Sequence, residues 1–149
     1  MGCQGGEVIT HGLRTLLLAQ SSITALAPSQ TVNRVSMPSV FVKSAPMNAE
    51  PPFVVITRIN NDTMVCLDGT YGMTASEIDI DSYGYSEEDS QTLSTTIRQF
   101  LDDYTGAAGG SDTINAVVWQ DENHEDVKPQ DGRDTRWYIS TNSFLIQHS

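Results

Sequence analysis

The chain has 149 residues and a formal net charge of -11, because nineteen acidic side chains outnumber eight basic ones. This balance argues against proteins that wrap nucleic acid or bind anionic membranes, since both need clusters of Lys and Arg. The length favours one domain, 1–149, which buries enough surface to fold without disulfides or metals, with a loose Gly-rich stretch at 1–6.

The two cysteines, Cys3 and Cys66, have neither the spacing of a metal pair nor the number needed for a disulfide framework. No apolar run approaches the roughly 20 residues of a membrane span, and the N-terminus lacks the apolar core of a signal peptide. We therefore expect a soluble protein made in a cytoplasm, with free thiols and no membrane partner.

The first predicted element is an amphipathic helix that starts at Val8. Its mostly apolar stripe follows helical spacing and comprises Ile9, Leu13, Leu16, Leu17 and Gln20. Ser21 or Ser22 is placed to cap a second, short helical turn, which Pro28 closes.

Residues 29–52 read as extended and irregular, because prolines recur there and proline is excluded from central strands. Val40–Val42 is a short strand candidate within this segment. Residues 53–59 form a stronger candidate, since they are rich in β-branched side chains and bounded by Pro52 and an Asn-Asn-Asp turn signal. Residues 63–67 can pair with it or with the strand that follows.

The most informative stretch runs from 76 to 104. Ile78 and Ile80 alternate with three acids, which is typical of a strand with one buried face. Gly84 breaks the strand, and Ser86 is placed to cap a helix with an acidic first turn. The helix is expected to end at Gly106 and to pack its apolar stripe on Ile78 and Ile80. That stripe comprises Leu93, Ile97, Phe100, Leu101 and Tyr104.

The C-terminal third predicts a hairpin. Residues 113–119 read as a strand and 135–146 as a long final strand. Residues 121–134 between them are acidic and contain a Pro-Gln-Asp-Gly turn, which gives the hairpin an acidic tip. Two sets of side chains compete for the buried face of the final strand, and the sequence leaves this open: Trp137 and Ile139, or Tyr138, Phe144 and Ile146.

These elements together predict the fold class. Sequential strand pairs give an antiparallel β-sheet, and two amphipathic helices need one face of it to cover. We therefore expect an α+β fold in which two helices pack on one face of an antiparallel sheet that ends in a terminal β-hairpin.

The sequence carries little catalytic chemistry. Glu77, Asp79 and Asp81 share one strand face and could hold a divalent cation through carboxylate oxygens, although a solvated strand face is the simpler interpretation. The histidines at 11, 124 and 148 lack the spacing of metal ligands. There is no nucleophile elbow and no phosphate-binding glycine loop. We expect no catalytic residue, no metal and no cofactor.

The order of these motifs carries a resemblance. A Leu-rich helix at 12–19 precedes a proline-bounded strand at 51–56. An Ile-Asp-Ile-Asp-Ser-Tyr-Gly strand then runs into Ser-Glu-Glu-Asp, and a hairpin with a long last strand closes the chain. Over residues 8–146 this order resembles the tail terminator, or tail completion, proteins of long-tailed, siphovirus-like bacteriophages. The extended 29–52 segment and the acidic hairpin depart from that family.

The resemblance implies a structural, non-enzymatic virion protein that assembles in the bacterial cytoplasm as a hexameric ring. Such a ring terminates the tail tube and contacts both the tail tube protein and the head-closure or connector protein. DNA passes through its lumen without specific binding. Two alternatives remain: another neck or tube subunit, such as a head-closure or tail-tube protein, and a small metal-dependent hydrolase or nuclease that uses Glu77, Asp79 and Asp81.

We expect the lumen of the ring to be acidic, because like charge keeps DNA from binding as it passes. The tip of the terminal hairpin is the favoured source of this charge, since a tip can reach the axis. Its candidate lumen-facing residues are Asp121, Glu122, Glu125 and Asp126. The alternatives are the acidic strand face at 77–81, and a hairpin that faces outward and keeps the subunit soluble.

Overall fold

The computed structural model describes residues 7–46, 48–63, 74–102, 104–108, 113–127 and 137–148. The Gly-rich stretch at 1–6, both cysteines, the predicted strand residues 64–67 and the predicted turn at 129–132 lie outside these residues.

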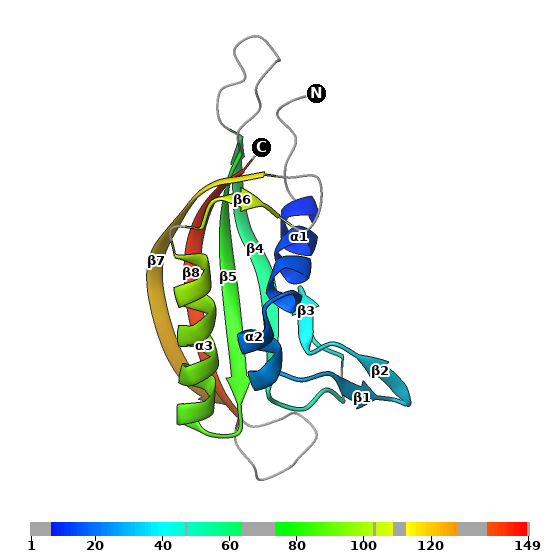
Figure 1. The fold of residues 1–149 in the computed structure, drawn as a ribbon. Helices are drawn as coiled ribbons and strands as arrows, with labels where there is room; N and C mark the ends of the chain where they lie inside the picture. The colour runs from blue at the N-terminus through cyan, green and yellow to red at the C-terminus, as the bar shows by residue number, and fades with distance from the viewer. Residues whose placement is uncertain are drawn as a thin grey trace.

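The described residues form helices α1 (Glu7–Leu18), α2 (Ser21–Leu26) and α3 (Glu87–Leu101). The strands are β1 (Gln30–Val32), β2 (Val35–Met37), β3 (Val40–Val42), β4 (Phe53–Thr63), β5 (Thr74–Gly84), β6 (Gly106–Ala107), β7 (Thr113–Val127) and β8 (Trp137–His148). The main sheet has the order β3-β4-β5-β8-β7-β6, and β1 and β2 form a separate antiparallel pair (Figure 1). Only β3 and β4 run parallel in the described sheet. The predicted α+β fold is confirmed.

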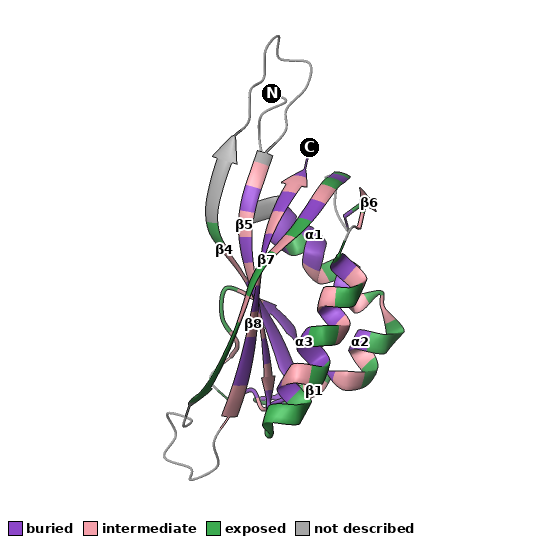
Figure 2. Cartoon of the chain, turned by 90° about the vertical axis from the view of Figure 1, so that its left-hand side faces the viewer, coloured by how far each residue is buried: buried purple, intermediate pink, exposed green. Residues whose placement is uncertain are grey.

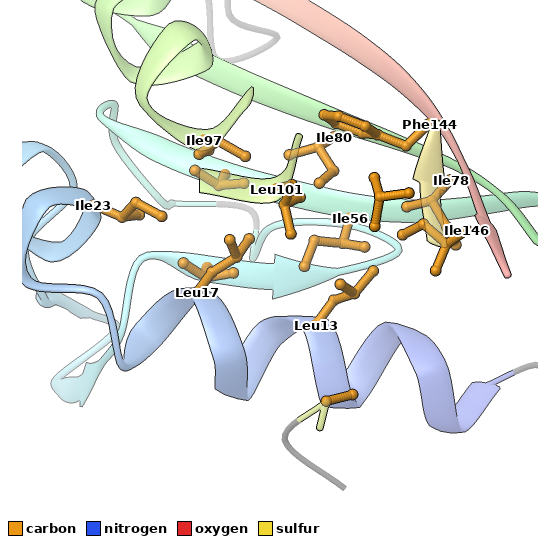
Figure 3. Packing of buried hydrophobic residues seen from close by; sticks show 14 of the residues in the cluster. Leu13, Leu17, Ile23, Ile56, Ile78, Ile80, Ile97, Leu101, Phe144 and Ile146 are labelled. Carbon is orange, nitrogen blue, oxygen red and sulfur yellow. The ribbon is translucent and has the colours of Figure 1, made fainter. Parts of the chain in front are cut away.

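The core lies between the helices and one face of the sheet. Figure 2 shows all three helices on the same side of the strands. From α1 and α3, the predicted stripes supply side chains that meet Ile78 and Ile80 of β5 (Figure 3). The fully or almost fully buried members of the stripes are Ile9, Leu13, Leu17, Leu93, Ile97 and Leu101. Phe100 is only half-buried and packs at the margin of this cluster.

The register of β8 settles which of its faces meets the helices. Phe144 and Ile146 are fully buried in the helix-covered core, and Phe144 lies opposite Ile78. Trp137 packs instead with a second cluster on the other face, around Phe53. Ile139 alternates with the core residues and is buried as well. The start of β8 is therefore covered on both faces, whereas from Ser140 onward buried residues alternate with half-buried ones.

The structure corrects the predicted end of α3. The helix stops at Leu101, and Asp102 is already extended, so Gly106 lies beyond the helix in β6. Carboxylates are unfavourable at a helix C-terminus, where the dipole is negative, and Asp102 stands at that position. Tyr104 therefore lies outside the helix, but its ring centroid is 5.4 Å from that of Phe100 and its hydroxyl donates to the Ala107 carbonyl.

The structure also corrects the prediction for residues 19–52. Gln20, not Ser21 or Ser22, is the N-cap of α2, and no side chain caps that helix. The segment after it contains the β1–β2 hairpin, which the prolines obscured. Its two turn residues, Asn33 and Arg34, have φ of 52° and 69°, the left-handed conformation that a tight two-residue hairpin turn requires.

Replacing Ser86 by Ala should lower the free energy of unfolding by about 1 kcal/mol, because Ser86 is the N-cap of α3. Its Oγ accepts a hydrogen bond from the Asp89 backbone N–H at 3.1 Å. Denaturant unfolding measures the change. Ser86→Asp, which keeps an acceptor at the cap, should lose much less, and an Ala variant with an unchanged midpoint would contradict the cap's contribution.

Candidate functional site

The face of the sheet that points away from the helices carries a row of acidic side chains. Glu77, Asp79 and Asp81 alternate along β5 with the buried Ile78 and Ile80, so the predicted common face of these acids is confirmed. All three are half-buried. We call the surface that they share with their neighbours on β7 and β8 the open face.

Hydroxyl groups of β8 hold two of these carboxylates. The Ser143 hydroxyl donates to Asp79 Oδ1 at 2.7 Å, and the Thr141 hydroxyl donates to Asp81 Oδ1 at 2.7 Å. Each pair lies directly opposite across the β5–β8 ladder. The carboxylates are thus fixed in place by neutral donors, and the negative charge of the face remains uncompensated by these contacts.

The strand β7 adds further acids to the open face. Asp121 lies opposite Ser143 and Glu125 opposite Ile139, and partners across an antiparallel ladder project to the same side. Glu122 and Asp126 lie opposite Asn142 and Tyr138, on the helix-covered side. The expectation that 121–126 belongs to a hairpin tip is wrong, since these residues form the outer half of a long strand. Only two of the four candidate lumen residues, Asp121 and Glu125, share a face with Asp79 and Asp81.

Burial and like charge both act on Asp81. Burial of the carboxyl raises its pKa, the Thr141 hydrogen bond lowers it, and the nearby charges of Asp79 and Glu125 raise it further, with a net upward shift. Burial, Asp81 and Glu125 likewise raise the pKa of the Tyr83 hydroxyl. The acids of two non-adjacent strands therefore act on one another across the open face.

Replacing Asp81 by Asn should raise the free energy of unfolding at neutral pH. Because the pKa of Asp81 is raised on folding, the folded state binds more protons than the unfolded state near that pKa, and stability falls as pH rises through it. The gain in the free energy of unfolding should stay well below the several kcal/mol that a fully buried charge costs. It should disappear when the pH falls below the ordinary pKa of Asp, because both side chains are then neutral. Denaturation from pH 3 to 7 measures it, with the exposed Asp121→Asn as the control. A variant less stable than the wild type at pH 7 would contradict the reasoning.

One end of the open face is covered. Phe53 stacks on Tyr83 with ring centroids 4.3 Å apart, and Trp137 meets Phe53 edge-on at 5.8 Å. Val32 of β1 and Phe41 of β3 are buried in the same cluster. The acidic part of the face therefore begins where this aromatic cluster ends, and the cluster, as far as the structure describes the chain, does not include the Asp79–Asp121 region.

The acids of β5 are also the residues of the alternative metal site. Within these ranges no group of three or more His, Cys, Asp and Glu side chains is arranged to hold a metal ion. Glu77, Asp79 and Asp81 follow one another along one strand face, and two of them already accept hydrogen bonds from β8.

A second polar cluster has the residue types of a catalytic triad. His124 Nε2 lies 3.1 Å from Glu122 Oε2, and its Nδ1 lies 2.9 Å from Ser140 Oγ. Ser140 Oγ also lies 3.2 Å from Ser90 Oγ of α3. However, Ser140 is fully buried, so no substrate reaches its hydroxyl. The cluster joins β7, β8 and α3, and the sequence could not reveal it because its members lie on three elements far apart in the chain.

The other histidines are also placed by the structure. His11 is exposed on α1. His148 is fully buried at the end of β8, with its Nε2 2.8 Å from Ser76 Oγ. The three histidines thus lie on separate elements, and none contacts the acids of the open face in the hydrogen bonds seen for the described residues. No helix in the described part of the chain combines the length and apolar character needed to cross a membrane.

Comparison with known proteins adds one finding. No protein-family model and no curated protein matches the sequence. Sixteen chains of solved structures match the fold. One belongs to a structure described as the virion of a native gene transfer agent (GTA) particle, with a TM-score of 0.62, 10% sequence identity and coverage of 95% of each chain. At this identity the likeness shows a shared fold.

Proposed function

We propose that the protein is a structural subunit of a phage or phage-like particle, and that it forms a hexameric ring that terminates the tail tube and joins it to the head connector. The observation that carries the proposal is the likeness, over 95% of both chains, to a chain of a gene transfer agent virion. The resemblance of the sequence motifs to tail terminators supports the finer role. The subunit performs no catalysis in this role, and its partners are the tube protein, the connector and further copies of itself.

The open face supports an orientation of the subunit within that ring. The helices cover the opposite face of the sheet. The strand β3 forms one edge of the sheet, and the other edge is formed by the short β6 and by the part of β7 beyond it, so that β3 and β7 lie on opposite flanks (Figure 1). If the open face points toward the ring axis, the two flanks meet neighbouring subunits and the helices form the outer wall. This arrangement leaves the acids in the channel and the apolar core intact.

The charge of the open face fits a channel that DNA must traverse without binding. Glu77, Asp79, Asp81, Asp121 and Glu125 line this face. Among the described residues of β5, β7 and β8 there is no Lys or Arg, the side chains that hold phosphates. Repulsion acts within about 8–10 Å at physiological salt, which is the range of a wall close to the DNA. Of the residues predicted to face the lumen, we retain Asp121 and Glu125, and we assign Glu122 and Asp126 to the flank.

Electron microscopy of assembled tails tests the proposal. Tails made with and without the protein are imaged, and a ring with six-fold symmetry is expected at the head-proximal end of the tube only when the protein is present. A different symmetry at that position would contradict the hexameric ring. Decoration along the whole tube would identify a tube subunit instead, and density on the head without tails would identify a head-closure protein.

A further inference from the structure

We infer that the β1–β2 hairpin is an arm with which one copy of this chain docks on the outer edge of β7 in the next copy. The inference rests on the proposed ring, and it names the two surfaces that close it. In a closed ring each subunit uses two different patches, because a contact that continues around an axis is heterologous.

The arm is held at its base and exposed at its outer strand. The Gln30 side chain donates to the Glu50 carbonyl at 3.0 Å and accepts from the Glu50 N–H at 2.9 Å, and Val32 is buried against the aromatic cluster. By contrast, Val35 of β2 is 56% exposed, and Arg34 in the turn is exposed. The arm extends away from the sheet and helices (Figure 1). A two-stranded hairpin is marginal by itself in water, so an arm of this kind gains stability from a partner surface.

The arm belongs to an N-terminal segment whose net charge is opposite in sign to that of the rest of the chain. Residues 8–49 contain three basic side chains, Arg14, Arg34 and Lys43, and no Asp or Glu. Every acidic residue except Glu7 lies at position 50 or later. The tip of the arm is therefore cationic on a strongly acidic subunit, and another copy of the same chain is a partner with complementary charge.

The edge of β7 offers the complementary surface on the opposite flank. From Ala116 to Glu125, β7 pairs with β8 on one side and has no second strand beside it among the described residues. Figure 2 shows this edge toward the viewer, and Figure 1 shows the arm on the far side. Val118, 50% exposed, and the exposed acids Asp121 and Glu125 lie along it. Long free edge strands favour pairing with another chain.

The outward face of α3 fits the arm less well. A shallow hollow there is also acidic, lined by Glu87, Glu88, Gln91, Thr92, Thr95 and Thr96. However, the exposed large apolar side chains in the described residues are Val35, Ile59, Tyr85 and Val118, and none of them lies on α3. The β7 edge therefore combines a large exposed apolar side chain with opposite charge, whereas the residues that line the α3 hollow include no large apolar side chain.

Site-specific photo-cross-linking tests the contact. A photoreactive phenylalanine at Val35 is incorporated into the full chain, rings are assembled on tail tubes and irradiated, and the cross-linked peptide is identified by mass spectrometry. We expect a peptide from 113–127 of another copy. A peptide from α3, from the tube protein or from the same copy, in rings that keep six-fold symmetry, overturns the inference and leaves the ring intact. Absence of any ring with the wild-type chain overturns the proposed function as well.

Two substitutions at one position test the charge complementarity. Val35→Asp and Val35→Lys remove the same apolar contact from an exposed site, and equal melting temperatures establish that both variants fold. The quantity measured is the protein concentration at which half of the tube ends carry a ring. Val35→Asp should raise this concentration by about tenfold and Val35→Lys by roughly threefold or less, because only Val35→Asp places a carboxylate against the acids of β7. Equal effects, or a larger effect of Val35→Lys, overturn the inference.

Discussion

Replacing Phe144 by Ala should lower the free energy of unfolding by about 3–5 kcal/mol, the range found when a fully buried aromatic side chain is truncated. Phe144 is 0% exposed at the centre of the helix-covered core. It lies opposite Ile78 on one neighbouring strand and opposite Trp119 on the other. The cavity would therefore open between the helices and three paired strands, whose backbone is held by two ladders and cannot easily collapse.

The chain provides a matched control for this prediction. Phe100→Ala removes the same atoms from a side chain that is only half-buried at the margin of the same cluster. Its loss should be clearly smaller, because less apolar surface returns to water and solvent fills the space. Urea unfolding of both variants measures the difference. Equal losses, or a larger loss for Phe100→Ala, would contradict the assignment of Phe144 to the centre of the core.

The sequence predicted the parts of the fold that local chemistry specifies. Ser86 and the acidic turn after it mark the start of α3, and the alternation of Ile78 and Ile80 with acids marks β5. These signals work because a cap and a two-residue period depend on neighbours in the chain. The packing of α3 on β5 followed, since each element carries an apolar surface that must be covered.

The sequence did not predict strand structure where the side chains on both faces of a strand are exposed. In the outer half of β7, Asn123, Glu125 and Asp126 are all exposed, so no alternation of apolar and polar residues marks the strand. The sequence therefore assigned its acids to the tip of the hairpin. The β1–β2 hairpin was missed for a related reason, since its Asn33-Arg34 turn uses Arg in a left-handed conformation that usually belongs to Gly. The sequence also could not show that β5 and β7 contribute acids to the same face. Asp121 and Asp79 come together only because both lie opposite Ser143 of β8.

The open face contains one carboxylate, that of Asp81, that costs the protein stability. Burial and the charges of Asp79 and Glu125 raise the pKa of Asp81, which means that its ionised form is disfavoured in the folded state. A neutral residue at position 81 would favour the fold. A surface that opposes folding is expected where function needs it, and a channel wall that repels DNA is a function of that kind.

Reversing charge on the open face should make the proposed ring retain DNA instead of releasing it. We compare two double variants. One carries Asp121→Lys and Glu125→Lys, and the other carries Glu122→Lys and Asp126→Lys. Both change the same strand by the same charge, but the first pair projects to the open face and the second to the opposite side. Each lysine that contacts a phosphate adds about 0.9 to the slope of log affinity against log salt. The first variant should therefore hold DNA in the channel in a strongly salt-dependent way.

The measurement is DNA release from assembled particles at several salt concentrations, with rings first verified by microscopy. Release from the open-face variant should slow by at least about tenfold at low salt and recover at high salt, because added salt weakens phosphate contacts. The control variant should release DNA at the wild-type rate. Asp121 and Glu125 also lie along the proposed arm contact on β7. Release is therefore compared only among particles whose rings are seen by microscopy, and DNA retention in these particles should appear only in the first variant. Retention in both variants, or only in the control, would show that the open face is not the wall that DNA meets.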